Sequence, residues 1–557
     1  MAGIFHSWPK DHVVKADHQT PNYLTPAILL SILLLGLLLR LNGLDWGMPN
    51  GLHPDYSYHP DEIYLLSWAM MMQHGDIIPN NFVYGGTFYF STLQLINWLG
   101  AFLTEQFGGQ LLFNTILVGR TFGLIYALLT IYLVYATGRT LFSPATGLLA
   151  ALVLAVLPAH VFWAQRVRPD ELFALEFAAN FLIMARILKK QRTLSTNLVL
   201  GGLLLGVTVA TRFPALVLYF GYAVAIGLIL NNDFKRDRPK TLKKATFHLL
   251  IIAGTSCLGY LGASPYTVLY YQEFVSGLQI QWHFQSGVFL DAVNRGPNWF
   301  QYGGRILIQA VGYPFYGLML AAVIYSLWKR RAENLLLLAV ILPYFLLLSK
   351  TSWVVTRYTL PLLPGLAILV VSMLRDLATK KQILKIFAIG AIVVAVFWAV
   401  ALDLAYSNVL RGPDPRDTAT VWITENVEPD ATIGAFKCYD GDDFTNPPQT
   451  WRQKWCYFNM HREDIDQFLS LPFDYIVVNE DILSNTKRLG TQHPSLLPYN
   501  KLHIWSNRPS GYTLINTFSN NVSITGLDMG SYFTSIDYMI ARPTISIYKR
   551  DSLETEK

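Results

Sequence analysis

The chain has 557 residues, of which 52% are hydrophobic and only 14% are charged, and its formal net charge is +6. This composition is typical of a protein that crosses a membrane many times and carries a smaller soluble part. The positive charge does not indicate nucleic-acid binding, because the basic residues cluster between apolar runs, as the positive-inside rule expects.

Eleven apolar runs are long enough to cross a bilayer, since a spanning helix needs roughly 17–25 residues. In chain order we expect them at 24–42, 113–137, 146–163, 171–188, 196–212, 214–231, 246–263, 305–328, 333–348, 358–374 and 384–404. The first run is too long for the apolar core of a signal peptide, so we expect it to remain as a membrane anchor.

Basic loops predict the orientation of these spans. Lysine and arginine cluster in four of them, 189–192, 235–244, 329–331 and 375–385. We expect all four on the cytoplasmic side, together with the N-terminus. An odd number of crossings then places the C-terminus outside, in a multi-pass protein of the cytoplasmic membrane.

The character of the chain changes near residue 405. We expect 1–404 to be a transmembrane catalytic domain with long outer loops at 43–112 and 264–304. Short β-branched runs at 475–478 and 544–548 predict strands, so 405–557 reads as a small exoplasmic α/β or α+β domain. No group of residues in it looks catalytic, and we expect it to shape the substrate site or bind a partner.

The exoplasmic domain contains two cysteines, Cys438 and Cys456. An oxidising compartment permits them to form a disulfide, which we expect. In the outer loops, 62–74 and 88–103 predict helices that lie on the membrane surface. The aromatic residues of 264–304 suit the headgroup layer, and they could also stack on sugar rings.

An acidic pair, Asp61-Glu62, lies just outside the first apolar run. Carboxylates near a bilayer are costly and tend to mark function. The pair follows Pro60, so it also suits the first turn of a short helix, and both roles can hold together.

Several cations lie on the same predicted outer face, where the positive-inside rule does not expect them. Guanidinium groups bind phosphate oxygens with directed hydrogen bonds, so an anionic ligand would account for them. Alternatively, some reach the interface by snorkelling or pair with Asp170 or Glu171. The set is Arg120, Arg166, Arg168, Arg212, Arg295, Lys350 and Arg357.

Together these features suit chemistry on a lipid-linked anionic substrate. A phosphate on a polyprenyl chain is a good leaving group for a sugar, and cations stabilise the charge that grows on it. A carboxylate beside an acceptor hydroxyl serves as general base.

Four short motifs and their order resemble the GT-C glycosyltransferases that use polyprenyl-phosphate sugars, especially the protein O-mannosyltransferase and lipid A aminoarabinose transferase branches. The motifs are His59-Pro60-Asp61-Glu62, Arg168-Pro169-Asp170, Ser264-Pro265-Tyr266 and the run 357–364. Residues 416–433 also resemble the start of that family's soluble outer domain. The resemblance covers nearly the whole chain in order and topology, although each motif alone is weak.

The resemblance implies that Asp61 is the catalytic acid–base residue or lies beside the donor phosphate, with Glu62 as its usual neighbour. We expect the donor phosphate to meet Arg168, Arg357, Arg120 and Arg212. We place His59, Asp170 and Tyr358 in the substrate pocket. Some branches of the family bind a divalent metal, but no second acidic cluster with clear ligand spacing follows His59, Asp61 and Glu62, so no cofactor is predicted and the metal question stays open.

The predicted activity is that of an inverting hexosyl- or pentosyltransferase. It moves a monosaccharide from a polyprenyl-phosphate donor to a hydroxyl of a protein, lipid or glycan on the exoplasmic face. One alternative is a transporter or flippase of a lipid-linked anion, which would need charged sites near the bilayer midplane and an internal repeat. A second is a silent receptor or scaffold that carries the outer domain. The residues name neither the sugar nor the acceptor.

Overall fold

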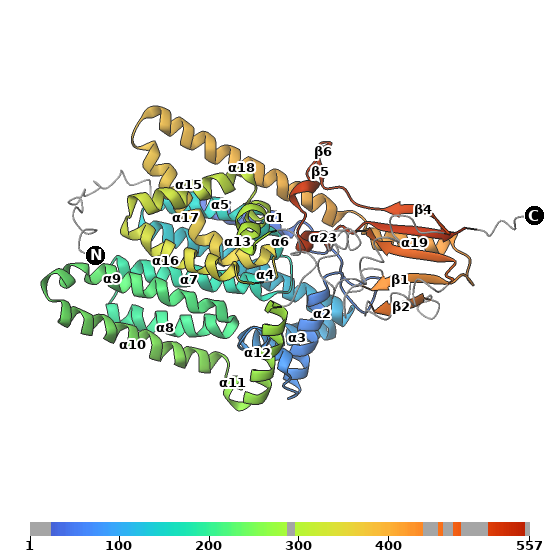
Figure 1. The fold of residues 1–557 in the computed structure, drawn as a ribbon, viewed down its shortest axis with the longest axis horizontal. Coiled ribbons are helices and arrows are strands. Elements are labelled where there is room, and N and C mark those ends of the chain that lie inside the picture. Colours follow the sequence, from blue (N-terminus) through green and yellow to red (C-terminus); the bar gives the residue numbers. More distant parts are fainter. Residues whose placement is uncertain are drawn as a thin grey trace, which may run out of the picture.

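The computed structural model describes residues 24–286, 296–351, 353–437, 455–459, 472–480 and 511–551. Most of this part of the chain is helical (Figure 1). The helices are α1 (Leu24–Leu41), α2 (Pro60–Gln73), α3 (Phe88–Phe107), α4 (Leu111–Leu141), α5 (Pro144–Ala155), α6 (Pro158–Trp163), α7 (Pro169–Leu188), α8 (Leu194–Thr211), α9 (Leu218–Arg236), α10 (Arg238–Ala263), α11 (Tyr266–Leu269), α12 (Tyr271–Ser286), α13 (Asn298–Gln301), α14 (Leu307–Val311), α15 (Tyr313–Lys329), α16 (Ala332–Leu348), α17 (Leu363–Ala378), α18 (Gln382–Arg411), α19 (Pro415–Asn426) and α23 (Ile536–Met539), with shorter turns η1 (Pro79–Phe82), η2 (Phe213–Val217), η3 (Tyr302–Ile306), η4 (Thr356–Leu362) and η7 (Gly530–Tyr532).

Each of the eleven predicted spans coincides with one helix or with helical segments in succession. The span at 146–163 is divided into α5 and α6, because Pro158 lacks a backbone N–H and Leu157 before it is extended. In the described part of the chain, seven helical segments are long and apolar enough to cross a membrane. The predicted class, a polytopic helical membrane protein with a C-terminal part that contains strands, is confirmed. The number of eleven crossings stays a prediction.

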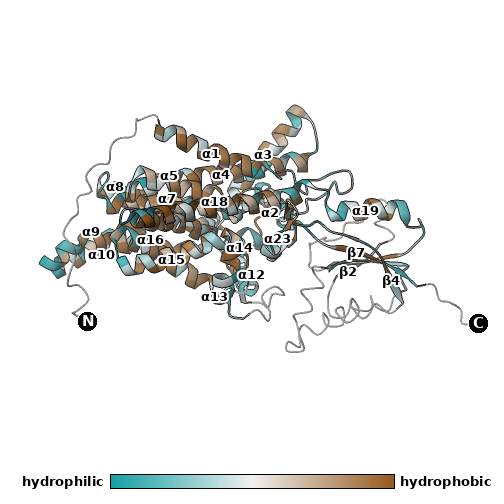
Figure 2. Ribbon diagram, turned by 90° about the horizontal axis from the view of Figure 1, so that it is seen from above, coloured by the Kyte–Doolittle hydropathy of each residue, from teal (hydrophilic) through white to brown (hydrophobic). Residues whose placement is uncertain are grey.

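Hydrophobic residues predominate along the helices of the bundle (Figure 2), and their buried side chains form its core. Small residues let some of these helices approach closely. A Cβ on Gly206 of α8 would come within 2.1 Å of the carbonyl oxygen of Ser256 on α10. A Cβ on Gly259 would come within 2.2 Å of the carbonyl oxygen of Leu203. These glycines allow the close packing of α8 against α10 that is common between membrane helices.

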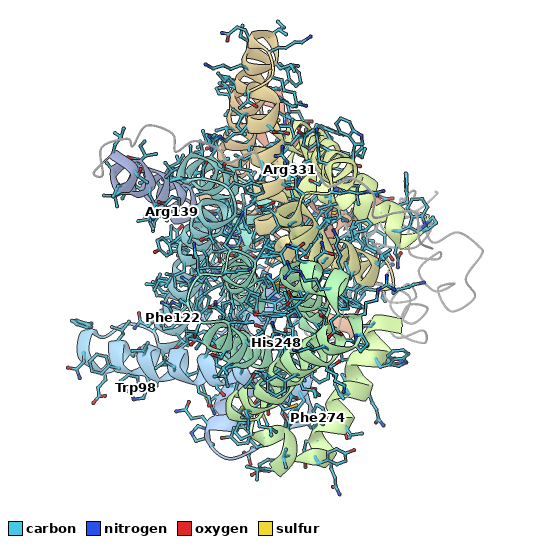
Figure 3. The ribbon with its side chains drawn as sticks, turned by 90° about the vertical axis from the view of Figure 1, so that its left-hand side faces the viewer. Trp98, Phe122, Arg139, His248, Phe274 and Arg331 are labelled. Atoms are coloured by element: carbon cyan, nitrogen blue, oxygen red, sulfur yellow. The ribbon has the colours of Figure 1, made fainter. Side chains whose placement is uncertain are left out.

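The turns α9–α10 and α17–α18 lie at the end of the bundle away from the C-terminal strands (Figure 1). They hold the predicted basic loops 235–244 and 375–385, which agrees with one shared side for these loops. The helices expected at 62–74 and 88–103 are present as α2 and α3, and a position of α2 on the membrane surface stays a prediction. Figure 3 shows α3 projecting sideways from the bundle, and its Trp98 is 56% exposed. An interfacial position for α3 stays a prediction.

The strands form a mixed five-stranded sheet in the order β2-β1-β3-β7-β4, with β5 and β6 as a separate pair. β1 pairs in parallel with β2 and β3, whereas β7 pairs antiparallel with β3 and β4. Helix α19 packs on the sheet through Ala419, Ile423 and Val427. The strands predicted at 475–478 and 544–548 are confirmed as β3 and β7. The bounds are β1 (Ile433–Lys437), β2 (Trp455–Asn459), β3 (Tyr475–Asn479), β4 (Tyr512–Phe518), β5 (Ser523–Ile524), β6 (Leu527–Asp528) and β7 (Ile545–Arg550).

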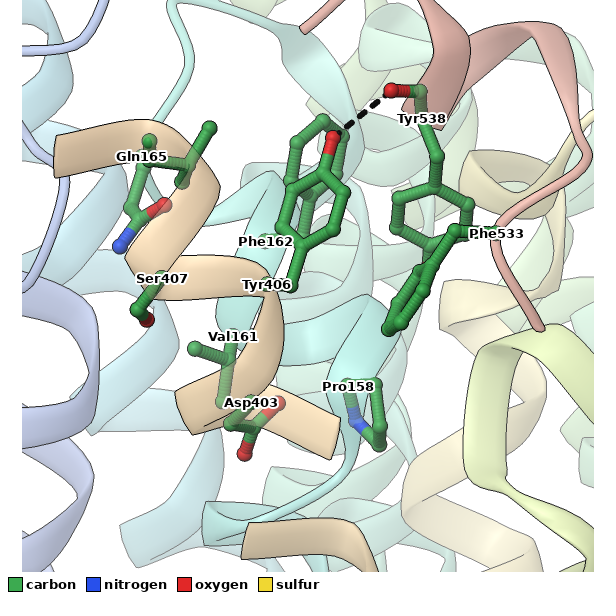
Figure 4. A pocket seen from close by; sticks show the side chains of 10 residues that line it. Pro158, Val161, Phe162, Gln165, Asp403, Tyr406, Ser407, Phe533 and Tyr538 are labelled. Carbon is green, nitrogen blue, oxygen red and sulfur yellow. Dashed lines mark hydrogen bonds between the residues drawn. The ribbon is translucent and has the colours of Figure 1, made fainter. Parts of the chain in front are cut away.

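One segment between β4 and β7, residues 522–541, returns to the helical bundle. Its buried Phe533 and Tyr538 belong to the same apolar core as the bundle helices. The hydroxyl of Tyr406 on α18 donates to the carbonyl oxygen of Tyr538 at 2.8 Å (Figure 4). We call residues 522–541 the return segment. Helix α18 also continues to Arg411, past the predicted domain boundary near residue 405, so this boundary stays a prediction.

The predicted disulfide falls on residues that the structure does not describe in full. Cys438 lies outside the described residues. For Cys456 only the backbone, within β2, is described. The bond therefore stays a prediction.

We predict that the C-terminal strands face outside and the α9–α10 turn faces the cytoplasm. The test places a single cysteine at exposed Thr513 or at exposed Lys243 in a protein whose three natural cysteines are serine. A membrane-impermeant maleimide should label intact cells only through position 513. Labelling at 243 instead, with permeabilised cells as the control for both, would show that the orientation is inverted.

Candidate active site

Two helices in the bundle begin with the same three residues. α2 begins with Pro60-Asp61-Glu62 and α7 begins with Pro169-Asp170-Glu171. Proline fits a first helical position because its missing N–H is not needed there, and carboxylates suit the positive end of a helix. The preceding residues, His59 and Arg168, are extended, as a following proline favours. The local sequence thus builds two acidic helix starts.

Arg168 joins these two helix starts. Its Nη1 forms an ion pair with the Asp61 carboxylate, and its Nε lies 3.4 Å from Oδ2 of Asp170. On the other side of Asp170, Nη1 of Arg212 donates to Oδ1 at 2.5 Å. The four side chains form a row of alternating charge, Asp61, Arg168, Asp170, Arg212. Only Asp61 is substantially exposed, at 40% of its side chain, so it is the accessible end of the row.

The charge state of Asp61 follows from its neighbours. Enclosure by protein acts to raise the pKa of the Asp61 carboxyl, but the positive charge of Arg168 more than offsets that effect, with a further contribution from Arg357. The pKa therefore lies below its ordinary value. Asp61 is ionised at neutral pH and can accept a proton or a hydrogen bond.

Arg357 and Tyr358 extend the cluster from the start of η4. The ring of Tyr358 lies between two guanidinium groups, 5.0 Å from that of Arg212 and 5.7 Å from that of Arg357. Nη1 of Arg357 donates to Oδ1 of Asp537 at 2.6 Å, whereas its Nε has no partner. The structure thus brings together six of the predicted site residues: Asp61, Arg168, Asp170, Arg212, Arg357 and Tyr358.

Arg120 and Glu62 need a different interpretation from the predicted one. Both are fully buried, and Nε and Nη2 of Arg120 bind the two Glu62 oxygens at 3.0 and 2.8 Å. Nη1 of Arg120 donates to two backbone carbonyls, and Glu62 also accepts from the hydroxyl of Ser57 and the backbone N–H of Val167. Both groups are thus engaged within the protein, which favours a structural role for this pair over the predicted roles in phosphate binding and catalysis.

His59 is also enclosed. Its ring nitrogens lie inside the protein without a hydrogen-bond partner, and its ring packs edge-on against Trp163 at 6.0 Å. Burial, opposed by the nearby acids, lowers the pKa of His59 to about 3, so the ring is neutral at physiological pH. This burial does not favour the predicted place of His59 in the substrate pocket.

Sequence reasoning missed three residues of this cluster. Tyr84 lies 5.1 Å from the Arg212 guanidinium, because the chain at Gly86 passes so close to α8 that a Cβ there would be 2.3 Å from the Ala210 carbonyl oxygen. Trp163 packs 5.4 Å from the Arg357 guanidinium, and Asp537 reaches it from the return segment. None of the three stands in a motif, and only the folded chain brings them together.

A divalent metal does not fit these side chains. In the part of the chain that the structure describes, no three His, Cys, Asp or Glu side chains are grouped so that they could hold a metal ion. The acids nearest the predicted position, Asp61 and Glu62, are engaged by Arg168 and Arg120.

We predict that Glu62→Gln destabilises the protein and Asp61→Asn does not. Removing one partner of a buried ion pair leaves Arg120 uncompensated, which costs about 3–5 kcal/mol. Asp61→Asn should have no such cost, because the Asp61 side chain is substantially exposed. Thermal unfolding in detergent measures both variants against the wild type; equal Tm values for all three would contradict the structural role of Glu62.

The advantage of the wild type over Glu62→Gln should also depend on pH. Burial acts to raise the pKa of Glu62, but Arg120 outweighs it and lowers the pKa to about 2, from an ordinary value of 4.5. A lowered acid pKa stabilises the fold above the unfolded pKa and loses that effect as pH falls through the folded one. The difference in Tm should therefore be full above about pH 5 and shrink between pH 4.5 and 2; a constant difference across that range would contradict this assignment.

A comparison with protein families finds one match within this chain. Residues 95–258 match the model of the dolichyl-phosphate-mannose-protein mannosyltransferase family. No curated protein sequence matches the chain significantly.

Solved structures share the fold at low sequence identity. The apo oligosaccharyltransferase of Archaeoglobus fulgidus is 13% identical and superimposes with a TM-score of 0.55, over 93% of this chain and 78% of that one. The same archaeal protein with an inhibitory peptide and a dolichol-phosphate gives 0.52, at the same identity and coverage. ArnT from Cupriavidus metallidurans, bound to undecaprenyl phosphate, is 13% identical with a TM-score of 0.46, over 94% and 97%. The resemblance to GT-C glycosyltransferases that the sequence predicts is confirmed.

Proposed function

We propose that the protein is an inverting glycosyltransferase that moves a monosaccharide from a polyprenyl-phosphate donor to a hydroxyl acceptor. The observation that carries this proposal is the row Asp61, Arg168, Asp170, Arg212, because it places one exposed carboxylate against Arg168. Arg212 and Arg357 belong to the same cluster, on either side of the Tyr358 ring. A phosphate leaving group and a proton acceptor are the two needs of the reaction. The fold shared with GT-C enzymes supports the same class.

The donor phosphate is proposed to bind at Arg168 and Arg357, with Arg212 behind them. A guanidinium group has five donors, so it can hold an acid of the protein and still reach a phosphate oxygen. Nη1 of Arg357 is engaged by Asp537 and its Nε is buried, whereas Arg168 contacts the exposed Asp61. The archaeal structure with a dolichol-phosphate belongs to a protein of this fold, which supports a lipid phosphate as the ligand.

Transfer then needs one displacement. The acceptor oxygen forms a bond to the anomeric carbon while the bond from that carbon to the phosphate oxygen breaks, and the electron pair leaves on the phosphate. The hydroxyl proton passes to Asp61. An incoming phosphate shares the charge of Arg168, which raises the pKa of Asp61 toward that of a useful base. A single displacement without a covalent intermediate inverts the configuration.

The cellular setting is part of the same proposal. We place the protein in the cytoplasmic membrane with the N-terminus inside and the acidic helix starts at the outer leaflet, because the basic loops gather at the opposite end of the bundle. The acceptor is a protein, lipid or glycan hydroxyl. The alternative, a flippase of a lipid-linked anion, would move the donor without cleaving it, so release of free polyprenyl phosphate separates the two.

We predict that Asp61→Asn abolishes transfer while expression and donor binding stay largely intact. Asparagine keeps the size of the side chain but cannot accept a proton usefully near neutral pH. A general base contributes about 10²–10⁴-fold, and a base that also orients the acceptor should lie at the upper end. Purified protein is incubated with polyprenyl-phosphate hexoses and pentoses, and free polyprenyl phosphate is measured. Near-normal turnover by Asp61→Asn would contradict the proposed role of Asp61 as general base.

Arg168→Lys should raise the donor KM by about tenfold or more, because lysine keeps the charge but loses the planar fork that serves Asp61, Asp170 and a phosphate together. Arg139→Lys is the matched control, since Arg139 is exposed at the far end of α4 (Figure 3). The control should leave KM unchanged. An unchanged donor KM for Arg168→Lys would remove this residue from the phosphate site.

A further inference from the structure

The return segment 522–541 packs on the helical bundle and also places a carboxylate in contact with the cation cluster. Asp537 is fully buried and ion-paired with Arg357. One of its oxygens, Oδ2, accepts from the backbone N–H and the hydroxyl of Thr356, each at 2.7 Å. The other, Oδ1, accepts from Nη1 of Arg357 at 2.6 Å. Thr356 therefore fixes one oxygen of the Asp537 carboxylate, and the other oxygen holds Arg357.

The position of Asp537 is set by independent contacts of the return segment. Gln309 of α14 accepts from the backbone N–H of Ser535 at 2.8 Å and donates to the hydroxyl of Thr534 at 2.9 Å. Tyr406 binds the carbonyl oxygen of Tyr538. These contacts flank Asp537 on both sides in sequence, so its backbone is held without any help from Arg357.

The interface around these contacts is closely packed. Phe162, Tyr406, Phe533 and Tyr538 line a cavity of only about 10 Å³ between α6, α18 and the return segment (Figure 4). That is room for about one water molecule. A carboxylate delivered by so close an interface has little freedom to move.

Asp537 uses only one of the donors of Arg357. Nη1 is taken by the carboxylate, whereas Nε has no partner. The guanidinium also packs 5.4 Å from the ring of Trp163 and 5.7 Å from that of Tyr358. Clamped at Nη1 and flanked by two rings, the group keeps one orientation. A guanidinium group has five N–H donors, so a single carboxylate does not use them all.

We propose that Asp537 is a positioning residue that holds Arg357 in the orientation in which it binds the donor phosphate. The inference rests on the proposed function and deepens it, because it makes the C-terminal part of the chain necessary for the affinity of the site. Asp537 itself does not touch the substrate. An opposite role, in which Asp537 competes with the phosphate for Arg357, would give the reverse sign when Asp537 is removed.

The test uses the full-length protein in detergent and decaprenyl phosphate as the probe, with binding measured by calorimetry. Asp537→Asn should weaken binding about tenfold or more, since Arg357 loses a charged partner. Asp528→Asn is the matched control, because it makes the same change at an exposed position of β6 in the same segment. It should bind the probe as the wild type does. Unchanged or tighter binding by Asp537→Asn would overturn the proposal.

A double-mutant cycle separates positioning from general stability. In an Arg357→Ala background, Asp537→Asn should cause no further loss of binding, because the residue acts through Arg357. The same loss in both backgrounds would show a merely structural role. If Asp537→Asn does not yield folded protein, Asp537→Glu replaces it: the longer side chain displaces Arg357 and should weaken binding, and wild-type binding would overturn the proposal.

Activity distinguishes this inference from the proposed function. If the wild type binds decaprenyl phosphate but transfers no sugar from any polyprenyl-phosphate donor, the proposed function fails while the role of Asp537 stands or falls on the binding data. If the wild type transfers sugar and Asp537→Asn binds normally, only the inference fails. If the wild type does not bind the probe, both fail.

Discussion

A charge that lies away from water is costly unless it is paired, and buried ion pairs hold together the end of the helical bundle at which α2 and α7 begin. Arg120 neutralises Glu62, Arg212 neutralises Asp170, and Arg357 meets Asp537. Each pair joins elements that are distant in sequence, so the pairing also fixes the positions of α2, α4, α7 and α8. Asp61, by contrast, remains substantially exposed beside Arg168, and it is the group to which we assign chemistry.

The two acidic helix starts show how the same local sequence serves two purposes. In α2 the glutamate is the structural member, held by Arg120, and the aspartate faces outward. In α7 the aspartate is buried between Arg168 and Arg212, where it orients both arginines. The proline and the helix dipole are common to both, so the tertiary partners alone decide which acid is available.

Much of the fold was predictable, because apolar runs and basic loops report spans directly. The sequence also predicted that Asp61, Arg168 and Arg357 share a face. It could not separate the roles of Asp61 and Glu62, since the partner of Glu62 lies 58 residues away on α4. Nor could it find Asp537, which is 180 residues from Arg357 and stands in no motif. A pairing between residues far apart in the chain leaves no pattern in the local sequence. A helix does leave one, in its hydrophobic periodicity and in its capping residues.

The return segment differs in its contacts from the rest of the C-terminal part of the chain. The sequence suggested a cap without chemistry, and the mixed sheet with α19 fits that description. Residues 522–541 do not, because they pack in the core of the bundle and place Asp537 beside the cation cluster. The C-terminal strands and the helical bundle are thereby coupled through the buried ion pair of Asp537 with Arg357, together with the hydrogen bonds and apolar contacts of the return segment.

The most direct test of the account is a structure of the protein with a polyprenyl-phosphonate sugar that cannot be cleaved. The account predicts phosphonate oxygens within about 3 Å of the guanidinium groups of Arg168 or Arg357. It also predicts that the anomeric carbon faces Asp61. A phosphonate bound elsewhere on the protein, with Arg168 and Arg357 making only their present contacts, would contradict it.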